Sequence, residues 1–454
     1  MSGKRLGVRA VDNHPVRSLT AALAAVCSSL LLVLPACSGE TGGAPAAKSI
    51  TIGVDLPLTG TEGQAGMSTF NGVRFFVQSH PRLDGFAIAI DARDDPVSST
   101  RYTARGLQDI EAFIAEPTVL AMIGPFDANV ARAQIPVANR AHLAVVSPVT
   151  SSRCLTKEPF LPSALNPART EITCAGAGLP SPAELRPTGV NNFFRLSTTD
   201  ELQGPAAADY ASKELHLQRM AVLTDGEGYG QALGDAFTAR FIRFGGVVVA
   251  HADHDPSKPV DATAFLQAGK RDGAQGVYYG GTSSNHACAL RSQMTQVFGA
   301  DSPAPLLGSD GIALDPACVS DAGATATAIY ATVPAVDAAQ LYTARPVIAA
   351  FRAKFGRPED LGPQTMAAYD ATGIVYDALD RAIKAAGGKI PARDSVVAEL
   401  AATTAFTGAT GVIGFDRAGD NTLRQLSIYR PAGTDPEADW TWVATIDYSA
   451  ALPY

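Results

Sequence analysis

The sequence has only one long apolar run, few cysteines and no catalytic signature, and each of these scarcities excludes a class of protein. Of 454 residues, 18% are charged and six are cysteine, and only the N-terminal region has an apolar run approaching membrane-spanning length. There is no GxSxG elbow, no HExxH pair and no GxxxxGK phosphate loop. Nothing places a base next to a nucleophile. We therefore expect no catalytic residues, no metal and no cofactor.

Two stretches look like ligand motifs but lack the full pattern. Asp225–Gly230 follows an expected strand and opens an expected helix, as a dinucleotide fingerprint does, but lacks the final x-x-G step. His251–Asp255 carries two histidines and two acids that could bind a divalent ion. A polar turn after a strand explains this second stretch better.

Basic residues do not predominate anywhere outside the N-terminal segment. The chain carries a formal net charge of −8, and its first 36 residues contribute +3, so the remainder carries −11. An acidic chain without a basic stripe argues against binding nucleic acid and against lying on an anionic lipid surface.

The N-terminal segment indicates export. A basic lead precedes an uncharged, mostly apolar run from Leu19 to Ala36, and small residues stand before Cys37. It resembles a bacterial lipoprotein signal over residues 1–36, which implies that Cys37 is lipidated and that 37–48 form a flexible tether. The protein would then be lipid-anchored at the extracellular face of the cell membrane. A simple transmembrane anchor stays open, because the run is only just short of the roughly 20 residues that span a bilayer.

Four cysteines remain beyond Cys37 in the exported chain. Cys154, Cys174, Cys288 and Cys318 form an even set in an oxidising compartment, which favours structural disulfides. Three connectivities are possible, and the sequential pairing closes short loops. The cysteines show no CxxC or Cys/His spacing that would suggest zinc binding or thiol redox chemistry.

Short apolar runs alternate with helical segments beyond Lys48, as is typical of parallel α/β sheets. We expect strands at Ile50–Leu56, Phe86–Asp91, Val119–Gly124, Leu143–Ser147, Met220–Thr224, Val247–Ala252, Gly276–Tyr279, Pro305–Leu307, Ile329–Val333, Arg424–Tyr429 and Trp440–Ile446. We expect helices at Gly66–Ser79, Thr100–Glu116, Asn129–Arg140, Gln231–Phe244, Ala262–Gly269, Asn285–Phe298, Asp337–Phe355 and Pro363–Ala386. An irregular stretch, Val149–Asn192, separates two α/β halves. The pattern predicts two doubly wound parallel-sheet lobes, with ligands at the carboxyl ends of the strands.

A series of short phrases resembles the leucine/isoleucine/valine-binding proteins, which are type I periplasmic solute-binding proteins of ABC importers. The first phrase is the expected opening strand and loop, Ile52–Gly60 (IGVDLPLTG). The others follow in the order of that family: Ile123–Pro125, Ile135–Asn139, Val146–Pro148, Phe194–Arg195 with Gln203–Gly204, Asp225 with Tyr229–Gly230, Tyr278–Gly281, Ala368–Ala371, and Thr410–Gly411 through Phe415–Asp416 to Gly419–Asp420. Each phrase is short, but their order covers essentially the whole mature chain.

The resemblance implies two α/β lobes joined by three crossovers, with the solute between the lobes. The crossovers would fall near Phe194–Ser197, Thr332–Ala335 and Phe415–Asn421. Lobe one would comprise residues 49–195 and 334–415, and lobe two residues 196–333 and 416–454.

The resemblance also implies a ligand site. In this family lobe one binds the α-carboxylate of an amino acid through backbone N–H groups and hydroxyls, and lobe two binds the α-ammonium through an acid. The matching lobe-one residues are Val149, Thr150 and Ser151, and the matching lobe-two residues are Tyr229 and Asp310. Both charges of a desolvated zwitterion must be met in this way, because leaving either without a partner costs several kcal/mol.

Two departures from the family pattern point to a different ligand. Ala128 stands where the family usually has a serine, so Asn129 would be the substitute donor, and the neighbouring Asp127 makes a ligand without a carboxylate more plausible. After Gly281, an aromatic contact is replaced by a polar segment that begins with Thr282. This replacement implies a more polar site.

Together these features predict an extracellular solute-binding lipoprotein of an ABC importer. It would bind an amino acid or a related small polar amine and deliver it to an ABC permease. A ligand-sensing lipoprotein that acts through a signalling partner is the alternative, since both would use the same pair of lobes. A secreted hydrolase is less expected, because it would need a nucleophile–base pair.

Overall fold

The computed structural model describes residues 48–60, 62–96, 102–158, 173–436 and 439–453. The expected export signal and tether, including Cys37, lie outside these residues. Among the residues described, no helix is both long enough and apolar enough to cross a membrane.

The first sheet has six strands in the order β2-β3-β1-β4-β5-β6, and every pairing except β2–β3 is parallel. The strands are β1 (Ser49–Leu56), β2 (Arg82–Leu83), β3 (Phe86–Asp94), β4 (Val119–Ile123), β5 (Ala144–Ser147) and β6 (Phe193–Arg195). Strands β4 and β5 are buried along their whole length, as expected for a sheet covered on both faces.

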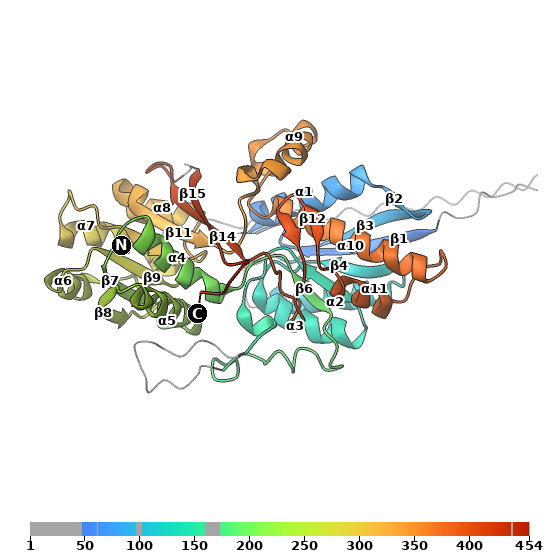
Figure 1. The fold of residues 1–454 in the computed structure, drawn as a ribbon, viewed down its shortest axis with the longest axis horizontal. Coiled ribbons are helices and arrows are strands. Elements are labelled where there is room, and N and C mark those ends of the chain that lie inside the picture. Colours follow the sequence, from blue (N-terminus) through green and yellow to red (C-terminus); the bar gives the residue numbers. More distant parts are fainter. Residues whose placement is uncertain (1–47, 61, 97–101, 159–172, 437–438, 454) are drawn as a thin grey trace, which may run out of the picture. The chain divides into compact units, whose positions relative to one another are not determined.

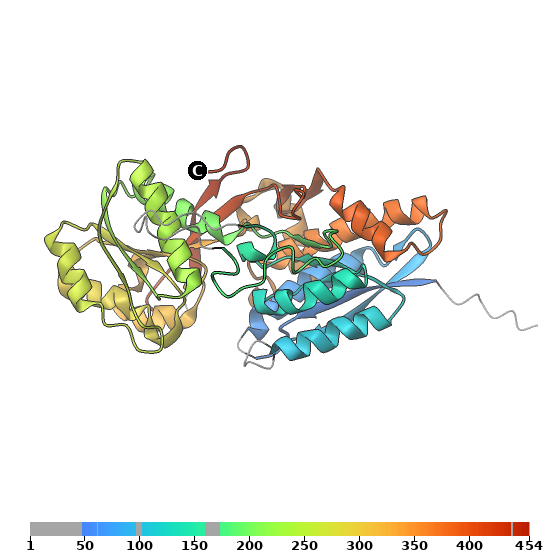
Figure 2. The same ribbon diagram turned by 90° about the horizontal axis from the view of Figure 1, so that it is seen from below.

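Helices cover both faces of this sheet. Helices α1 (Gly63–Ser79), α10 (Thr365–Ala385) and α11 (Arg393–Ala401) share one core with it, and α2 (Tyr102–Ala115) and α3 (Ala128–Arg140) share the other. Figure 2 shows α2 and α3 in cyan and teal, side by side along the sheet. The sheet and these helices are called lobe one below.

Helix α10 is held against α1 by an aromatic contact surface. Gly373 lies where a Cβ atom would be 2.7 Å from Phe406 Cζ and 3.0 Å from Phe76 Cε2, so the helices approach more closely than a larger residue would allow. The Tyr376 hydroxyl donates to the carbonyl of His80 at 2.8 Å. This packing buries a helix whose sequence alone is only moderately amphipathic.

The second sheet has seven strands in the order β15-β14-β11-β10-β9-β7-β8 (Figure 1). They are β7 (Arg219–Thr224), β8 (Val247–Asp253), β9 (Gly276–Gly280), β10 (Leu306–Gly308), β11 (Ile329–Val333), β14 (Gln425–Pro431) and β15 (Trp440–Asp447). Strands β7 to β11 pair in parallel, and β14 and β15 add antiparallel strands at one edge.

This second sheet is also covered on both faces. Helices α4 (Gln203–Lys213) and α5 (Gly228–Arg243) share one core with it, and α6 (Thr263–Arg271), α7 (Ala289–Phe298) and α8 (Pro316–Ala322) share the other. We call this sheet with its helices lobe two. Two doubly wound α/β lobes are therefore confirmed, while the residue boundaries expected for the lobes stay predictions.

Two expected helices are wrong in extent. The helix expected over Asn285–Phe298 begins only at Ala289, because Asn285 and His286 have φ values of 51° and 62°, in the left-handed region. The segment 337–355 is not one helix: two short 3₁₀ turns precede α9 (Arg345–Lys354), whose first turn holds Pro346. Proline lacks the N–H that an earlier helical turn would need, so it starts the helix here.

Several elements were not expected from the sequence: α4, α8, α11 and the two-stranded hairpin of β12 (Phe406–Gly408) and β13 (Gly411–Ile413). Helix α4 shows why. It is buried from Gln203 to Ala211 on every side, so it lacks the polar face that reveals a surface helix in a sequence.

Arg195, at the end of β6, is joined to Asp420, which lies 225 residues later in the chain. Arg195 Nε lies 2.7 Å from Asp420 Oδ1, and Lys157 Nζ lies 2.7 Å from Asp420 Oδ2. The Arg195 guanidinium is fully buried and also donates to the carbonyl of Ser152 at 2.6 Å and to the hydroxyl of Thr156. Burial alone would raise the pKa of Asp420, but Arg195 and Lys157 outweigh it and lower the pKa to about 2.

We predict that Asp420→Asn lowers the free energy of unfolding at neutral pH by about 3–5 kcal/mol, because it leaves a buried guanidinium without its counter-charge. Urea denaturation measures the loss. The half-exposed ion pair of Asp377 with Arg381 supplies the control, since Asp377→Asn should change stability by less than about 1 kcal/mol.

The same substitution should have a defined pH signature. A carboxylate whose pKa is lowered on folding stabilises the protein above its unfolded pKa of about 3.9, and that contribution is lost as pH falls through the folded value. The stability difference between the wild-type protein and Asp420→Asn should therefore shrink between about pH 4 and pH 2. A difference that stays constant over this range would show that the charge of Asp420 is not what stabilises this region.

Candidate functional site

Three expected ligand residues of lobe two follow parallel strands of its sheet. Tyr229 lies in the first turn of α5, after β7; Thr282 follows β9; and Asp310 follows β10. The Tyr229 hydroxyl donates to Asp310 Oδ1 and lies 3.0 Å from the hydroxyl of Ser309. The structure therefore brings two of the expected residues into direct contact.

Thr282 belongs to the loop packed directly against the Asp310 loop. A Cβ atom on Gly311 would lie 2.3 Å from the carbonyl oxygen of Gly281 and 3.2 Å from Thr282 Cα, so only glycine fits here. The backbone N–H of Ser283 donates to the carbonyl of Gly311 at 2.8 Å. The Thr282 side chain itself is exposed and contacts the Ser284 hydroxyl at 2.9 Å.

The Gln203 side chain fixes the position of Asp310. Its Oε1 accepts from the Asp310 N–H and from the Thr332 hydroxyl, both at 3.0 Å. This orientation directs Nε2 to carboxylates: Asp310 Oδ1 at 2.8 Å and Asp200 Oδ1 at 3.1 Å. Because both ends of the buried amide are hydrogen-bonded, it cannot turn over without losing these bonds.

Asp200 is a candidate site residue that the sequence analysis did not identify. It opens a 3₁₀ turn just before α4, and an acid at the start of a helix was the available signal, although capping explains such an acid equally well. Its backbone N–H donates to the carbonyl of Ser151 at 3.0 Å. Asp200 therefore links the lobe-one loop to the acid of lobe two.

The two carboxyl groups perturb each other. Burial, and after it the charge of Asp310, raises the pKa of Asp200 to about 7. Burial also raises the pKa of Asp310, against the opposing hydrogen bonds from Tyr229 and Gln203. The pair is therefore a place where a positive charge is favoured.

In lobe one, the loop after β5 holds the three expected carboxylate-binding residues. The N–H groups of Val149 and Thr150 donate to the Ser147 hydroxyl oxygen at 3.2 and 2.9 Å, and that hydroxyl donates to the carbonyl of Pro125. These amides are thus already engaged. The Thr150 hydroxyl oxygen is buried and has no hydrogen-bond partner among the residues described, so it remains the available polar group here.

Asn129 and Asp127 have structural roles at the start of α3. Asp127 is the N-cap and accepts from the N–H groups of Asn129 and Val130 at 2.6 and 3.3 Å. The Asn129 side-chain oxygen accepts from Arg132 at 2.5 Å. The role of Asn129 as a substitute for the missing serine stays a prediction.

The histidine-rich stretch, expected as a polar turn, begins within the strand: His251 to Asp253 are the last residues of β8, and only His254 and Asp255 follow it. Asp253 accepts from the Thr224 hydroxyl at 2.5 Å, and His254 Nε2 lies 3.1 Å from the Tyr279 hydroxyl. In the part of the chain that the structure describes, no group of three or more His, Cys, Asp or Glu side chains could hold a metal ion.

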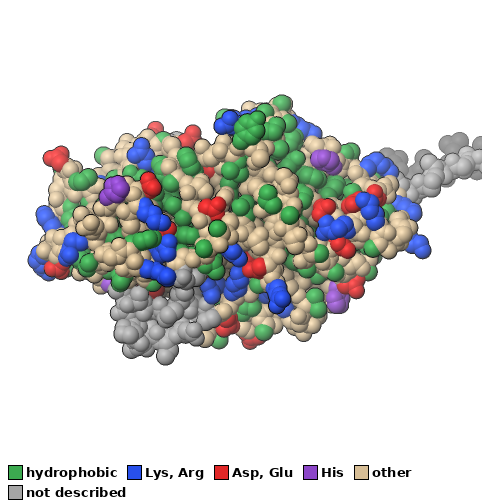
Figure 3. Space-filling view, viewed as in Figure 1, with side chains coloured by type: hydrophobic (Ala, Val, Ile, Leu, Met, Phe, Trp, Pro, Cys, Tyr) green, Lys and Arg blue, Asp and Glu red, His purple; other side chains and the backbone are tan. Residues whose placement is uncertain are grey.

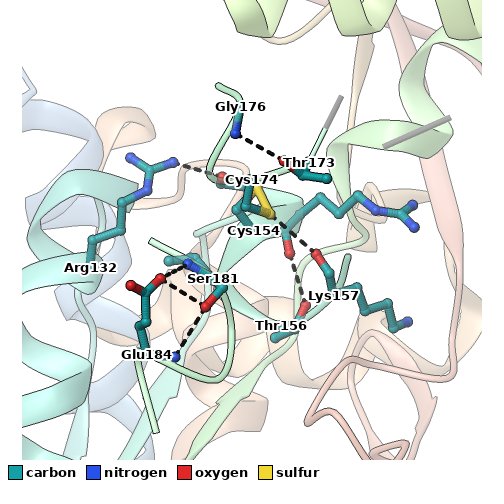
Figure 4. Close-up of a disulfide and its surroundings, with 12 residues drawn as sticks. Arg132, Cys154, Thr156, Lys157, Thr173, Cys174, Gly176, Ser181 and Glu184 are labelled. Carbon is teal, nitrogen blue, oxygen red and sulfur yellow. Dashed lines mark hydrogen bonds between the residues drawn. A yellow bond between two sulfur atoms is a disulfide. The ribbon is translucent and has the colours of Figure 1, made fainter. Parts of the chain in front are cut away.

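Two disulfides are present, in the sequential pairing. Cys154 joins Cys174 and Cys288 joins Cys318, with sequence separations of 20 and 30 residues. Figure 4 shows the first disulfide and the Arg132 guanidinium turned toward the segment around it. Arg132 donates to the Ser152 hydroxyl at 2.9 Å, so the disulfide and this contact both hold the loop that carries Ser151.

Comparison with known families gives one clear match. The family model described as "Periplasmic binding protein" matches residues 49–434. The Leu/Ile/Val-binding protein homolog 3 of Brucella melitensis is 28% identical over 247 residues, which make up 54% of this chain and 63% of that protein. The chain thus spans about three fifths of the length of that relative.

Solved structures share the fold. A leucine-binding protein LivK from Thermotoga maritima superposes with a TM-score of 0.62 at 22% identity, covering 87% of this chain and 98% of that one. A solute-binding protein of an ABC transporter from R. palustris, in complex with 4-hydroxybenzoate, superposes with a TM-score of 0.64 at 18% identity, covering 88% and 97%. Proteins of this fold therefore include binders of chemically different solutes.

We predict that replacing both Cys154 and Cys174 by alanine lowers the free energy of unfolding by about 3 kcal/mol, because the unfolded chain gains the freedom of a 20-residue loop. It should also weaken solute binding, since the Ser151 loop loses its support. Replacing Cys288 and Cys318 should cost similar stability with little effect on binding. Equal effects of the two double variants on binding would contradict a local role for the first disulfide.

Proposed function

Since the chain belongs to the periplasmic binding protein family, we propose that it is the solute-binding component of an ABC importer. It binds an amino acid or a related small polar amine between its two lobes and passes it to a permease. The protein itself performs no chemistry on the solute. The names of its relatives, which bind branched-chain amino acids, support the solute class, and the two-lobed fold supports the mode of binding.

One arrangement carries the proposal: an acid held ready at the carboxyl ends of the lobe-two strands. Asp310 Oδ1 receives hydrogen bonds from Tyr229 and Gln203, which hold the carboxylate in one orientation. A preorganised carboxylate binds an ammonium group well because the acid loses little freedom when the ligand arrives. The facing Ser151 loop of lobe one supplies the second side of the site.

The surface charge is consistent with a protein that binds a small solute rather than a polyanion. Acidic and basic side chains are interspersed over the face shown in Figure 3. The net charge of −8 gives no attraction for nucleic acid.

A thermal-shift screen of the chain from Ser38 onward against amino acids, amides, polyamines, aromatic acids and sugars tests the proposal. A ligand at about 100 times its Kd adds about 2.7 kcal/mol to the stability of the folded state and raises Tm by a few degrees. For the solute that binds, Asp310→Asn should raise Kd at least about tenfold, equivalent to about 1.4 kcal/mol, because it removes the charge facing the ammonium.

Asp272→Asn is the matched control, since Asp272 is an exposed acid of lobe two at the end of α6. It should leave Kd unchanged. An unaltered Kd in a folded Asp310→Asn protein would show that Asp310 does not bind the solute. If no compound of the panel raises Tm, the proposed solute class is wrong.

We further propose that the protein is tethered to the outer face of the cell membrane through a lipid on Cys37. The basic lead, the apolar run and the small residues before this cysteine support the assignment. Two acyl signals give stable anchoring without a spanning helix.

Cys37→Ala should abolish incorporation of a labelled fatty acid during expression, whereas Cys27→Ala, inside the signal, should not affect it. Mass spectrometry of the mature N-terminus checks the result. A wild-type protein that resists alkaline extraction from membranes yet carries no acyl group would instead indicate a simple transmembrane anchor.

A further inference from the structure

Two carboxylates lie together at the proposed site, although a zwitterionic amino acid would need only one acid for its ammonium group. Asp310 is the acid that follows β10, but the backbone N–H of Asp200 donates at 3.0 Å to the carbonyl of Ser151, the residue expected to bind an α-carboxylate. Both carboxylates bind the same Gln203 amide nitrogen, so their nearer oxygens lie within about 6 Å of each other. A ligand carboxylate at Ser151 would therefore lie beside a carboxylate of the protein.

We propose that the solute is an organic amine without an α-carboxylate, held as a cation by Asp200 and Asp310 together. This inference rests on the proposed function and narrows its solute class. The ammonium group of such a ligand neutralises the carboxyl pair, which would otherwise repel, and Gln203 keeps both acids directed toward it. The organic remainder extends toward the Thr282 loop, where polar groups replace an aromatic contact.

The lobe-one loop offers little to a carboxylate. The N–H groups of Val149 and Thr150 donate to Ser147, and the N–H of Asn129 donates to Asp127. Arg132 of this lobe donates to Asn129 and Ser152. An incoming carboxylate would have to compete with these existing bonds.

Further acids increase the negative potential of the same region. Burial, followed by the charges of Asp315 and Asp127, raises the pKa of Glu62, so one acid of lobe two and two of lobe one affect one another. Arg153 is paired with Glu201 at 3.1 Å, and Arg195 with Asp420, so both cations are already neutralised. The field between the loops thus favours a cation.

The test compares each amino acid with the amine that has the same side chain and no carboxyl group. Suitable pairs are leucine with isoamylamine, tyrosine with tyramine, histidine with histamine, and lysine with cadaverine, measured by calorimetry on the full mature chain. In at least one pair the amine should bind at least about tenfold more tightly, the change that corresponds to one pKa unit of charge interaction. An amino acid that binds more tightly than its amine overturns the inference and leaves the proposed function intact.

Asp200→Asn separates the second acid from the first. It should weaken binding of the amine and strengthen binding of the matching amino acid, so that the ratio of their Kd values falls at least about tenfold. Asp310→Asn should weaken binding of both. A preference that Asp200→Asn leaves unchanged in a folded protein overturns the role of Asp200. If neither member of any pair binds, the amine class is wrong, and the broader screen then decides whether the proposed function fails as well.

Proton exchange gives an independent readout. The charged and titratable groups around the pair are Glu201, Arg153, Arg195, Tyr229 and Tyr278, and the arginines are ion-paired. Without ligand, Asp200 and Asp310 share a proton, and a cation that displaces it should bind more tightly as pH rises from about 5.5 to about 8. Calorimetry in buffers of different ionisation enthalpy should then detect the released proton. An amine whose affinity does not change over this range, with no proton released, would contradict a shared proton.

Discussion

The buried ion pair between Arg195 and Asp420 is the interaction that holds β6, the segment around Asp420 and the Ser151 loop together. It joins the end of the last lobe-one strand to a segment that arrives 225 residues later, and the backbone N–H of Arg195 also donates to the carbonyl of Gly419. A guanidinium with no exposed surface is tolerated only when its charge and its N–H groups are all matched. The acceptors on Ser152 and Thr156 complete that set, so the crossover region and the Ser151 loop are stabilised together.

The disulfide at Cys154 and the contact of Arg132 with Ser152 strengthen the same loop from the other side. The loop that faces the proposed solute therefore does not depend on its own short sequence for its shape. In lobe two a single buried glutamine, the first residue of α4, orients both acids. Rigid supports on both lobes are what allow a small ligand to be recognised by a few polar contacts.

The proposed solute class follows from charge rather than from shape. The family to which the chain belongs includes binders of branched-chain amino acids, and a related fold holds 4-hydroxybenzoate. Such differences arise because the lobes supply a scaffold and the loops after the strands supply the chemistry. In this chain two acids, Asp200 and Asp310, bind one glutamine at these loops, and Asp200 contacts Ser151, the residue expected to bind a carboxylate.

The two-lobed α/β architecture could be predicted from the chain alone, because buried parallel strands leave short apolar runs between helical segments. The sequence also pointed to Tyr229 and Asp310, which follow strands of one sheet and do meet. It could not show α4, which is buried all round, or the breaks at Asn285 and Pro346, where single residues override a helical pattern. The contacts of Asp200 with Ser151 and of Gln203 with Asp310 come from the tertiary fold, since contacts between residues 49 and 107 positions apart leave no periodic trace in the chain.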